Sequence, residues 1–442
     1  MVDTTSPKNP MLRVMALRDF RLLFSGTATS LLGDQFALIA TPWLVLKLTG
    51  DPLTLGIVLA LEGIPRAVLM LLGGAITDRL SPRLLMLASD IIRFLLTAMM
   101  AMVIFFGTIP LWMIYAFSLG FGLVAGFAIP AENSIVPMLV EERDLQAGNS
   151  IIMGMAQLVG FIGPTVAGIL IGGFSRSSSG IGMAFAFDAA TFAVSATTLW
   201  LMHGGGRRSR SGGSPESESV WASILTGVKY LWRDKVLRMM FLVVTAVNFL
   251  ITGPLLVGIP VLASQRFSEG AVAFGLLMSA YAGGNLAGYL IAGSLPRPGG
   301  NAMRIFIILL LTAFGAVIGS FGYIPFLWVD FSLMLLLGVG NGYLSIILFT
   351  WMQTRTPREM LGRMMSILML SNTGLVPIAQ AISGAVSKWS LTGLFASAGG
   401  LVLLVTLWTA LQPELRQFSE SLTSEPPRET KKIRAGEEPS IG

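Results

Sequence analysis

Six ionisable side chains are predicted to lie at membrane depth within long apolar stretches of this 442-residue sequence. They are Asp34, Glu62, Arg66, Asp90, Arg93 and Asp188. A charged group is costly in an apolar medium, so such residues pair with one another or serve a function. The four acids outnumber the two bases, which leaves at least two carboxyl groups without a basic partner at that depth. Desolvation disfavours a charged carboxylate, so these residues suit the binding and release of protons.

Asp34 is the first candidate for this proton chemistry, because it stands in GDQF between hydrophobic helical turns. The alternative for Asp34 is a structural acid that is hydrogen-bonded to a neighbouring helix. Glu62 and Asp188 are the next candidates. Glu62 lies four residues before Arg66, so the two can also pair on one helix face. Asp90 and Arg93 are predicted to form a structural ion pair.

The composition indicates a protein that is embedded in a membrane. Hydrophobic residues make up 53% of the chain and charged residues 12%, against about 25% charged residues in soluble domains. The mean hydropathy is +0.74. Backbone groups in lipid must be satisfied internally, and the apolar runs here are continuous rather than alternating, which favours helices over a barrel. We expect an all-α polytopic membrane protein.

Twelve apolar runs are long enough to cross a bilayer, since a spanning helix needs about 20 residues. They lie at 20–47, 53–77, 84–106, 109–130, 146–172, 181–203, 237–262, 271–294, 302–322, 326–351, 362–387 and 391–411. The runs divide the chain into two six-helix bundles, 20–203 and 237–411. A cytoplasmic N-terminus at 1–19, a linker at 204–236 and a disordered cytoplasmic tail at 412–442 complete the layout.

The linker begins with GGGRRSRSGGSPESES, a composition that cannot bury a core. Apolar residues then repeat at helical spacing from Val220 to Met239, accompanied by Lys229, Arg233 and Lys235. This pattern predicts either an amphipathic helix on the cytoplasmic surface or a basic extension of the seventh span.

The basic residues predict the orientation, since cytoplasmic loops carry an excess of Lys and Arg. Of the 30 Lys and Arg residues, all but six fall in segments on the side of the N-terminus. The six are Lys47, Arg176, Arg266 and Lys388 on the other side and Arg66 and Arg93 within spans. We therefore expect both termini to be cytoplasmic in a multi-pass protein of the inner (plasma) membrane.

The two halves carry matching features. Gly56 and Gly74 in the second span are as far apart as Gly275 and Gly293 in the eighth. Pro164 in the fifth span corresponds to Pro377 in the eleventh. Repeated six-helix halves place a substrate site at their interface near the midplane.

Several functional classes are disfavoured by what the sequence lacks. The chain has no Cys and a single His, His203, which argues against thiolate metal sites and His-based catalysis. We expect no enzyme activity, no cofactor, no metal and no nucleic-acid partner, and a monomer that interacts with a small molecule, protons and the lipid bilayer. A non-transporting receptor is the alternative from another class.

The polar segment GAITDRLSPR at 74–83 resembles the loop signature of the major facilitator superfamily, with Ser81-Pro82 where the family usually has Gly-Arg. GPTVAG at 163–168 resembles the fifth-helix signature of its antiporter branches, with Ala167 for one Gly. PAENSIVPMLVEERDLQAGNSI at 130–151 and DIIRFLL at 90–96 are similar to the macrolide-efflux and siderophore-export branch, the drug:proton antiporters.

The resemblance implies a rocker-switch transporter in which Gly74, Asp78, Arg79 and Arg83 form a cytoplasmic gate that is shut in the outward-facing state. The alternative is that these charges only set the topology. By the same resemblance, the antiporter-like helix motif falls on Gly163, Pro164 and Gly168.

The expected function is proton-coupled efflux of hydrophobic or cationic drug-like compounds by alternating access. Export of a specific metabolite such as a siderophore, or lysolipid transport, is the alternative. Polar or aromatic side chains within the spans are candidates for the substrate cavity: Phe36, Asn248, Asn285, Asn372 and Gln380.

Overall fold

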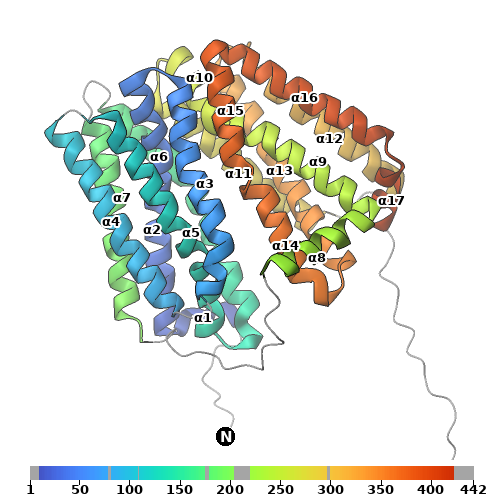
Figure 1. Ribbon diagram of the computed structural model, residues 1–442, viewed down its shortest axis with the longest axis horizontal. Helices are drawn as coiled ribbons and strands as arrows, with labels where there is room; N and C mark the ends of the chain where they lie inside the picture. Colours follow the sequence, from blue (N-terminus) through green and yellow to red (C-terminus); the bar gives the residue numbers. More distant parts are fainter. Residues whose placement is uncertain are drawn as a thin grey trace, which may run out of the picture.

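The computed structural model describes residues 9–77, 81–107, 109–174, 179–203, 220–295 and 299–422. At 71–77, 220–224, 358, 359, 362, 366, 370 and 372 it describes the backbone alone. Throughout these ranges the chain forms helices joined by short turns, without a strand (Figure 1). The predicted all-α polytopic fold is confirmed.

The N-terminal half contains six long helices. They are α2 (Arg18–Thr49), α3 (Pro52–Thr77), α4 (Pro82–Phe106), α5 (Leu111–Leu139), α6 (Leu145–Gly173) and α7 (Ser179–Leu201). A short turn of 3-10 helix, η1 (Glu142–Asp144), precedes α6. The close packing of α2 on α7, of α3 on α5 and of α4 on α7 holds this half together.

The C-terminal half repeats this plan with two interruptions. Its helices are α9 (Lys235–Gly253), η2 (Pro254–Gly258), α10 (Ile259–Arg266), α11 (Ala271–Ser294), α12 (Gly300–Ser320), α13 (Leu327–Arg355), α14 (Arg358–Thr373), α15 (Val376–Trp389) and α16 (Leu391–Leu411). The seventh span is one path through α9, the π-helical η2 and α10. The eleventh is split into α14 and α15 just before Pro377, because a proline lacks the N–H that continues a helix.

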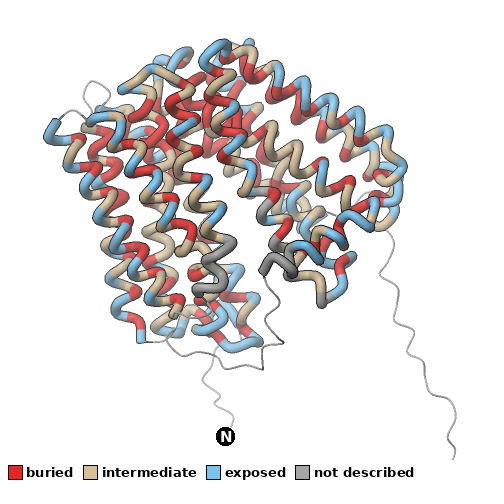
Figure 2. The backbone as a smooth tube through the Cα atoms, in the orientation of Figure 1, coloured by how far each residue is buried: buried red, intermediate tan, exposed pale blue. Residues whose placement is uncertain are grey.

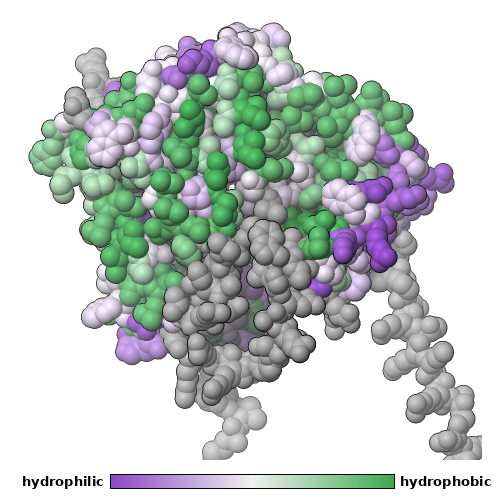
Figure 3. Space-filling model, viewed as in Figure 1, coloured by the Kyte–Doolittle hydropathy of each residue, from purple (hydrophilic) through white to green (hydrophobic). Residues whose placement is uncertain are grey.

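Eleven helical segments among the described residues are long and apolar enough to cross a membrane. The split helix α14–α15 is the remaining span, so the helices agree with the predicted twelve. Figure 3 shows apolar side chains over the visible sides of the helices, with hydrophilic ones concentrated toward their ends. The buried residues lie mainly on the helix faces that turn toward neighbouring helices (Figure 2).

Three short helices lie outside the spans: α1 (Pro10–Ala16), α8 (Val220–Arg233) and α17 (Pro413–Ser421). Helix α8 is separate from α9, because Asp234 adopts an extended conformation between them and caps α9. Residues 413–421 were expected in a disordered tail but form α17, whose Phe418 and Leu415 are buried against the bundle. That prediction was wrong for α17, whereas 204–219 and 423–442 lie outside the described residues.

The two halves meet at one end of the molecule and diverge at the other (Figure 1). Across the halves, α6 packs on α11 and α3 packs on α15. We call the end where α3 and α11 begin the closed end, and the end that carries α1, α8 and α17 the open end.

Candidate functional site: an acidic cavity between the halves

A cavity of about 420 Å³ lies between the halves and is lined mostly by α2, α3, α4 and α5. The C-terminal half contributes Leu256, Phe274 and Gln380. Six ionisable side chains line it: Asp34, Glu62, Arg66, Asp90, Arg93 and Glu132. The structure therefore gathers at one cavity five of the six residues that the sequence singled out, and adds Glu132.

Glu62 and Arg66 form an ion pair on α3, with Arg66 Nη1 3.2 Å from Glu62 Oε1. This is the pairing that their spacing of four residues allows. The two side chains are 26% and 36% exposed, respectively. The pair is therefore partly exposed at the cavity.

Arg93 does not form the predicted ion pair with Asp90. Its guanidinium lies over two adjacent aromatic rings, 5.3 Å from the Phe121 centroid and 5.5 Å from the Phe192 centroid. Asp90 instead interacts with the Ser195 side chain of α7. The prediction was wrong because helical spacing describes neighbours on one helix, whereas the rings come from α5 and α7.

Arg93 is nevertheless the centre of the electrostatics in this half. It is buried, and its Nε has no hydrogen-bond partner in the described part of the chain. Asp34, Glu132, Asp90 and Asp188 all interact electrostatically with its guanidinium. One buried cation therefore balances several carboxyl groups, and a proton or a cationic ligand is needed to neutralise the rest.

Asp188 lies behind the cavity wall rather than on it. It is fully buried on α7, and neither carboxyl oxygen has a hydrogen-bond partner among the described residues. Helix α2 approaches it at Gly33, where an added Cβ would lie 2.5 Å from Asp188 Oδ1. Asp34 follows Gly33 on the cavity side, so the two acids stand on either side of one tight helix contact.

Sequence reasoning missed Glu132 and Asp330. Glu132 was missed because the fourth span was ended at Pro130, whereas α5 continues through Pro130 and Pro137 to Leu139. Prolines are tolerated inside membrane helices, and this was the available signal. Asp330, in the first turn of α13, is fully buried at the closed end near Arg266 and does not line the cavity.

The predicted gate is described in part. Asp78 and Arg79 lie outside the described residues, and Gly74 stands in the segment of α3 described by its backbone alone. Arg83 donates hydrogen bonds to the carbonyl oxygens of Leu199 (2.7 Å) and Trp200 (2.8 Å). It thereby ties the start of α4 to the carboxyl end of α7, where a cation is favourable.

The antiporter-like motif lies where the two halves touch. Gly168 packs against the backbone of α11, where an added Cβ would lie 2.6 Å from the Ala271 carbonyl oxygen. Thr165 donates its N–H (3.0 Å) and its hydroxyl (2.8 Å) to Ser279 Oγ. Pro164 is buried within α6, and Gly163 packs on Gln35 of α2.

The predicted cavity residues divide among different places. Gln380 lines the acidic cavity, and its Oε1 is buried without a partner among the described residues. Phe36 was assigned wrongly, because it faces the core and packs on Phe187 with a centroid distance of 4.4 Å. Asn248 lines another pocket in the C-terminal half. Asn285 is buried beside that pocket, and the side chain of Asn372 lies outside the described residues.

An ion pair joins the halves at the closed end, with Lys388 Nζ 3.4 Å from Asp51 Oδ1. Asp51 also accepts hydrogen bonds from the Leu53 N–H (3.3 Å) and the Thr54 hydroxyl (2.9 Å). Partial desolvation raises the pKa of Asp51, but these hydrogen bonds and the Lys388 charge lower it by more. The pKa of Asp51 therefore lies below its usual value. Asp51 is therefore ionised in this arrangement at neutral pH.

Among the described residues, no three His, Cys, Asp or Glu side chains converge in a way that would hold a metal ion. The described lining of the cavity offers carboxyl, guanidinium and amide side chains for ion pairing and hydrogen bonding.

A family model described as Major Facilitator Superfamily matches residues 23–380. The multidrug efflux pump Tap of Mycolicibacterium fortuitum is 24% identical over 434 residues, covering 96% of this chain and 100% of Tap. The enterobactin exporter EntS of Shigella flexneri is 25% identical over 422 residues, covering 91% and 93%.

The fold agrees with these relatives. A bacterial homologue of the iron transporter ferroportin, solved in an inward-facing state, superposes with a TM-score of 0.65 at 16% identity over 89% of this chain and 99% of that one. Members of this family are transporters rather than enzymes. The chain is a multi-pass membrane transporter that belongs to the Major Facilitator Superfamily.

Proposed function

We propose that this transporter exports cationic, amphipathic compounds in exchange for protons. The observation that carries the proposal is the surplus of carboxyl groups around the buried Arg93 at the central cavity. A cation can supply the missing positive charge, and so can protons. An anionic substrate would add to the charge that Arg93 already fails to balance.

Competition between substrate and protons gives the coupling. Asp34 lines the cavity and interacts electrostatically with Glu132, Glu62 and both arginines. Proton binding at Asp34 removes one charge from this cluster and weakens the attraction for a cation. Substrate binding in turn favours the loss of that proton, because the two ligands neutralise the same group. Glu62 and Asp188 are the further proton-binding candidates.

The apolar part of the substrate is accommodated by the remaining lining. Leu31, Phe117 and Ile129 of the N-terminal half face Leu256 and Phe274 of the other half across the cavity. Mostly apolar walls with a few placed polar groups are typical of sites for small amphipathic molecules. Gln380 supplies the polar group of the C-terminal half.

The proposed orientation places the open end in the cytoplasm, with both termini on the cytoplasmic side of the plasma membrane. The basic residues support this orientation. The structure then corresponds to an inward-facing state, in which the cavity receives substrate from the cytoplasm. Contacts at the closed end must break, and Gly74, Asp78, Arg79 and Arg83 must approach the C-terminal half, to reach the outward-facing state.

Export of a specific metabolite is the second candidate, and the similarity to the enterobactin exporter EntS favours it. The charge of the cavity favours export of cationic compounds over export of an anionic metabolite, because acidic walls repel an anion. A chain that exports a metabolite of that charge would use the cavity in another protonation state.

Proton release on substrate binding tests the proposal. Purified protein in weakly buffered detergent solution with a pH indicator is mixed with tetraphenylphosphonium, a permanent cation. We expect saturable proton release that is reduced in Asp34→Asn and unchanged in Asp19→Asn, which alters a half-buried acid of α2 outside the cavity lining. Saturable binding without proton release would contradict the coupling, and absence of binding would contradict the cationic substrate.

A further inference from the structure

A second pocket lies within the C-terminal half and shares no lining residue with the acidic cavity. It has a volume of about 380 Å³ and is enclosed by α9, α11, α12, α13, α14 and α17. Ser345 and Phe349 of α13 are lining residues that are also exposed, so the pocket reaches the surface beside them. Its volume falls within the range of small-molecule sites, about 300–1,000 Å³.

The walls of this second pocket are apolar and carry no Asp, Glu, Lys, Arg or His among the described residues. Met240, Val243, Leu311 and Phe314 are representative of its lining. A charged ligand would lose its hydration here without gaining a counter-charge, which costs more than an apolar contact returns. The pocket therefore selects against ions of either sign.

A polar edge crosses the otherwise apolar lining. Asn341 donates from Nδ2 to Asn285 Oδ1 at 2.7 Å, and Asn285 donates from Nδ2 to the Tyr281 carbonyl oxygen at 2.9 Å. This chain of bonds fixes which end of each amide is the donor. Among the described residues the Asn341 side chain makes no other hydrogen bond, so its second N–H and its Oδ1 remain for a ligand. Thr252 adds a hydroxyl group to the same lining.

The seventh span, through α9 and η2, separates the second pocket from the acidic cavity. Thr252 at the end of α9 lines the pocket, whereas Leu256, one turn further in η2, lines the cavity. The π-helical geometry of η2 changes the side-chain register between them, and such segments are frequent at functional sites. Gly253, at the junction, packs on the Ala379 backbone of α15, so the wall has little room to deform.

We propose that the second pocket is a binding site for an uncharged, mainly aromatic or alicyclic molecule that presents a carbonyl or hydroxyl group to Asn341. This goes beyond the proposed function, because the site is separate from the acidic cavity and its ligand carries no charge. The chain thus has two recognition chemistries, one acidic and one neutral, on opposite sides of η2. Binding at the second pocket needs no proton, so it is insensitive to pH between about 5 and 8, where carboxyl and imidazole groups titrate.

Photolabelling with benzophenone, an uncharged diaryl ketone, tests this site on the full-length protein in detergent. Labelled peptides are identified by mass spectrometry as the probe concentration is raised. Leu344→Trp fills the pocket from α13, and Leu336→Trp makes the same substitution at a lipid-exposed position of that helix. Asn341→Leu removes the amide at similar volume, and provides an independent test if Leu344→Trp is poorly folded.

We expect saturable labelling of α9 and α13 that falls about tenfold in Leu344→Trp and is retained in Leu336→Trp. Asn341→Leu is expected to weaken apparent affinity about fivefold, as for one lost hydrogen bond. Excess tetraphenylphosphonium and Asp34→Asn should leave the labelling unchanged. Labelling that does not saturate, or that Leu344→Trp and Asn341→Leu leave intact, would overturn the inference. Binding of tetraphenylphosphonium to the same preparation reports separately on the acidic cavity.

Discussion

Gly56 of α3 and Gly384 of α15 pack so closely across the two halves that a Cβ built on Gly384 would lie 2.9 Å from the Gly56 Cα. Gly168 of α6 and Gly275 of α11 form the corresponding contact on the other side of the interface. Both contacts are at the closed end, and both depend on the absence of a side chain, as at small-residue helix crossings in membranes. The closed end is therefore a specific packing arrangement.

Gly168→Leu is expected to force α6 and α11 apart and shift the population away from the closed arrangement. A leucine side chain would meet the Ala271 carbonyl oxygen and the Gly275 backbone. Because the chain has no Cys, spin labels at Leu84→Cys and Gln353→Cys would measure the separation of the halves at the open end. In Gly168→Leu we expect the distribution to move to shorter distances, because the open end closes.

Gly160→Leu is the matched control, since it lies on the same helix and a Cβ there would meet nothing within 4 Å. An unchanged distance distribution in Gly168→Leu, or the same change in both variants, would contradict the role of this packing.

Lys388→Met is expected to weaken the closed end by removing the ion pair with Asp51. Both side chains are partly exposed, so the pair is worth at most about 1 kcal/mol and the population should shift by less than about fivefold. The same pair of spin labels measures the shift between wild type and Lys388→Met. High salt screens the ion pair, so the two distance distributions should become the same there. A larger effect, or one that resists salt, would mean that Lys388 acts through another contact.

The pH dependence of the same contact follows from the lowered pKa of Asp51. A carboxyl group whose pKa is lowered by its contacts stabilises them fully above its ordinary pKa of about 3.9, and loses that effect as the pH falls through the lowered value. The contribution of Lys388 should therefore be constant from about pH 8 to 5 and vanish in stronger acid. Titration of the distance distribution in wild type and Lys388→Met checks this, and a midpoint near neutral pH would be inconsistent with Asp51.

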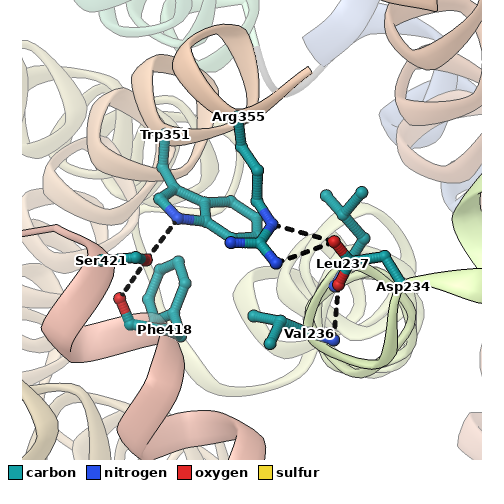
Figure 4. A network of polar contacts seen from close by, with 7 residues as sticks. All are labelled: Asp234, Val236, Leu237, Trp351, Arg355, Phe418 and Ser421. Atoms are coloured by element: carbon teal, nitrogen blue, oxygen red, sulfur yellow. Dashed lines mark hydrogen bonds and ion pairs between the residues drawn. The ribbon is translucent and has the colours of Figure 1, made fainter. Parts of the chain in front are cut away.

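Asp234→Ala is expected to destabilise the C-terminal half, because Asp234 has two roles (Figure 4). It accepts hydrogen bonds from the Val236 and Leu237 N–H groups at the start of α9, and from Arg355 Nη2 at 2.8 Å. Arg355 lies over the Trp351 ring, and Trp351 Nε1 donates to Ser421 Oγ of α17 at 2.8 Å. Losing the cap alone costs about 1 kcal/mol of unfolding free energy.

Thermal unfolding in detergent measures this effect, with Glu141→Ala as the control. Glu141 forms an exposed ion pair with Arg143 that contributes little. Equal midpoints for the two variants would show that the Asp234 network does not stabilise this half.

The sequence was sufficient for the parts of the fold that depend on hydrophobic length and charge. The spans, the two halves and five of the six ionisable residues at the acidic cavity follow from these properties alone. The equivalence of Pro164 and Pro377 also proved informative, since each stands where its helix packs on the opposite half: α6 on α11 and α15 on α3.

The partners of the cavity residues did not follow from the sequence. Arg93 was paired with Asp90 by helical spacing, but its position is decided by Phe121 and Phe192, whose approach depends on tertiary packing. A helix end at Pro130 would place Glu132 outside the fourth span, but α5 continues through Pro130 to Leu139. Inside a bundle, local breakers are overridden by neighbouring helices, so boundaries near prolines are hard to predict.

The proposed coupling of transport to a proton gradient depends on the Asp34 carboxyl group. The most direct test is accumulation of tetraphenylphosphonium in inverted membrane vesicles under an imposed pH difference, acidic inside, with wild type and Asp34→Asn compared at equal expression. We expect gradient-dependent accumulation by wild type and a loss of about tenfold in Asp34→Asn, which corresponds to about 1.4 kcal/mol of coupling. Wild-type transport that ignores the pH difference, or an Asp34→Asn variant that remains fully coupled, would contradict it.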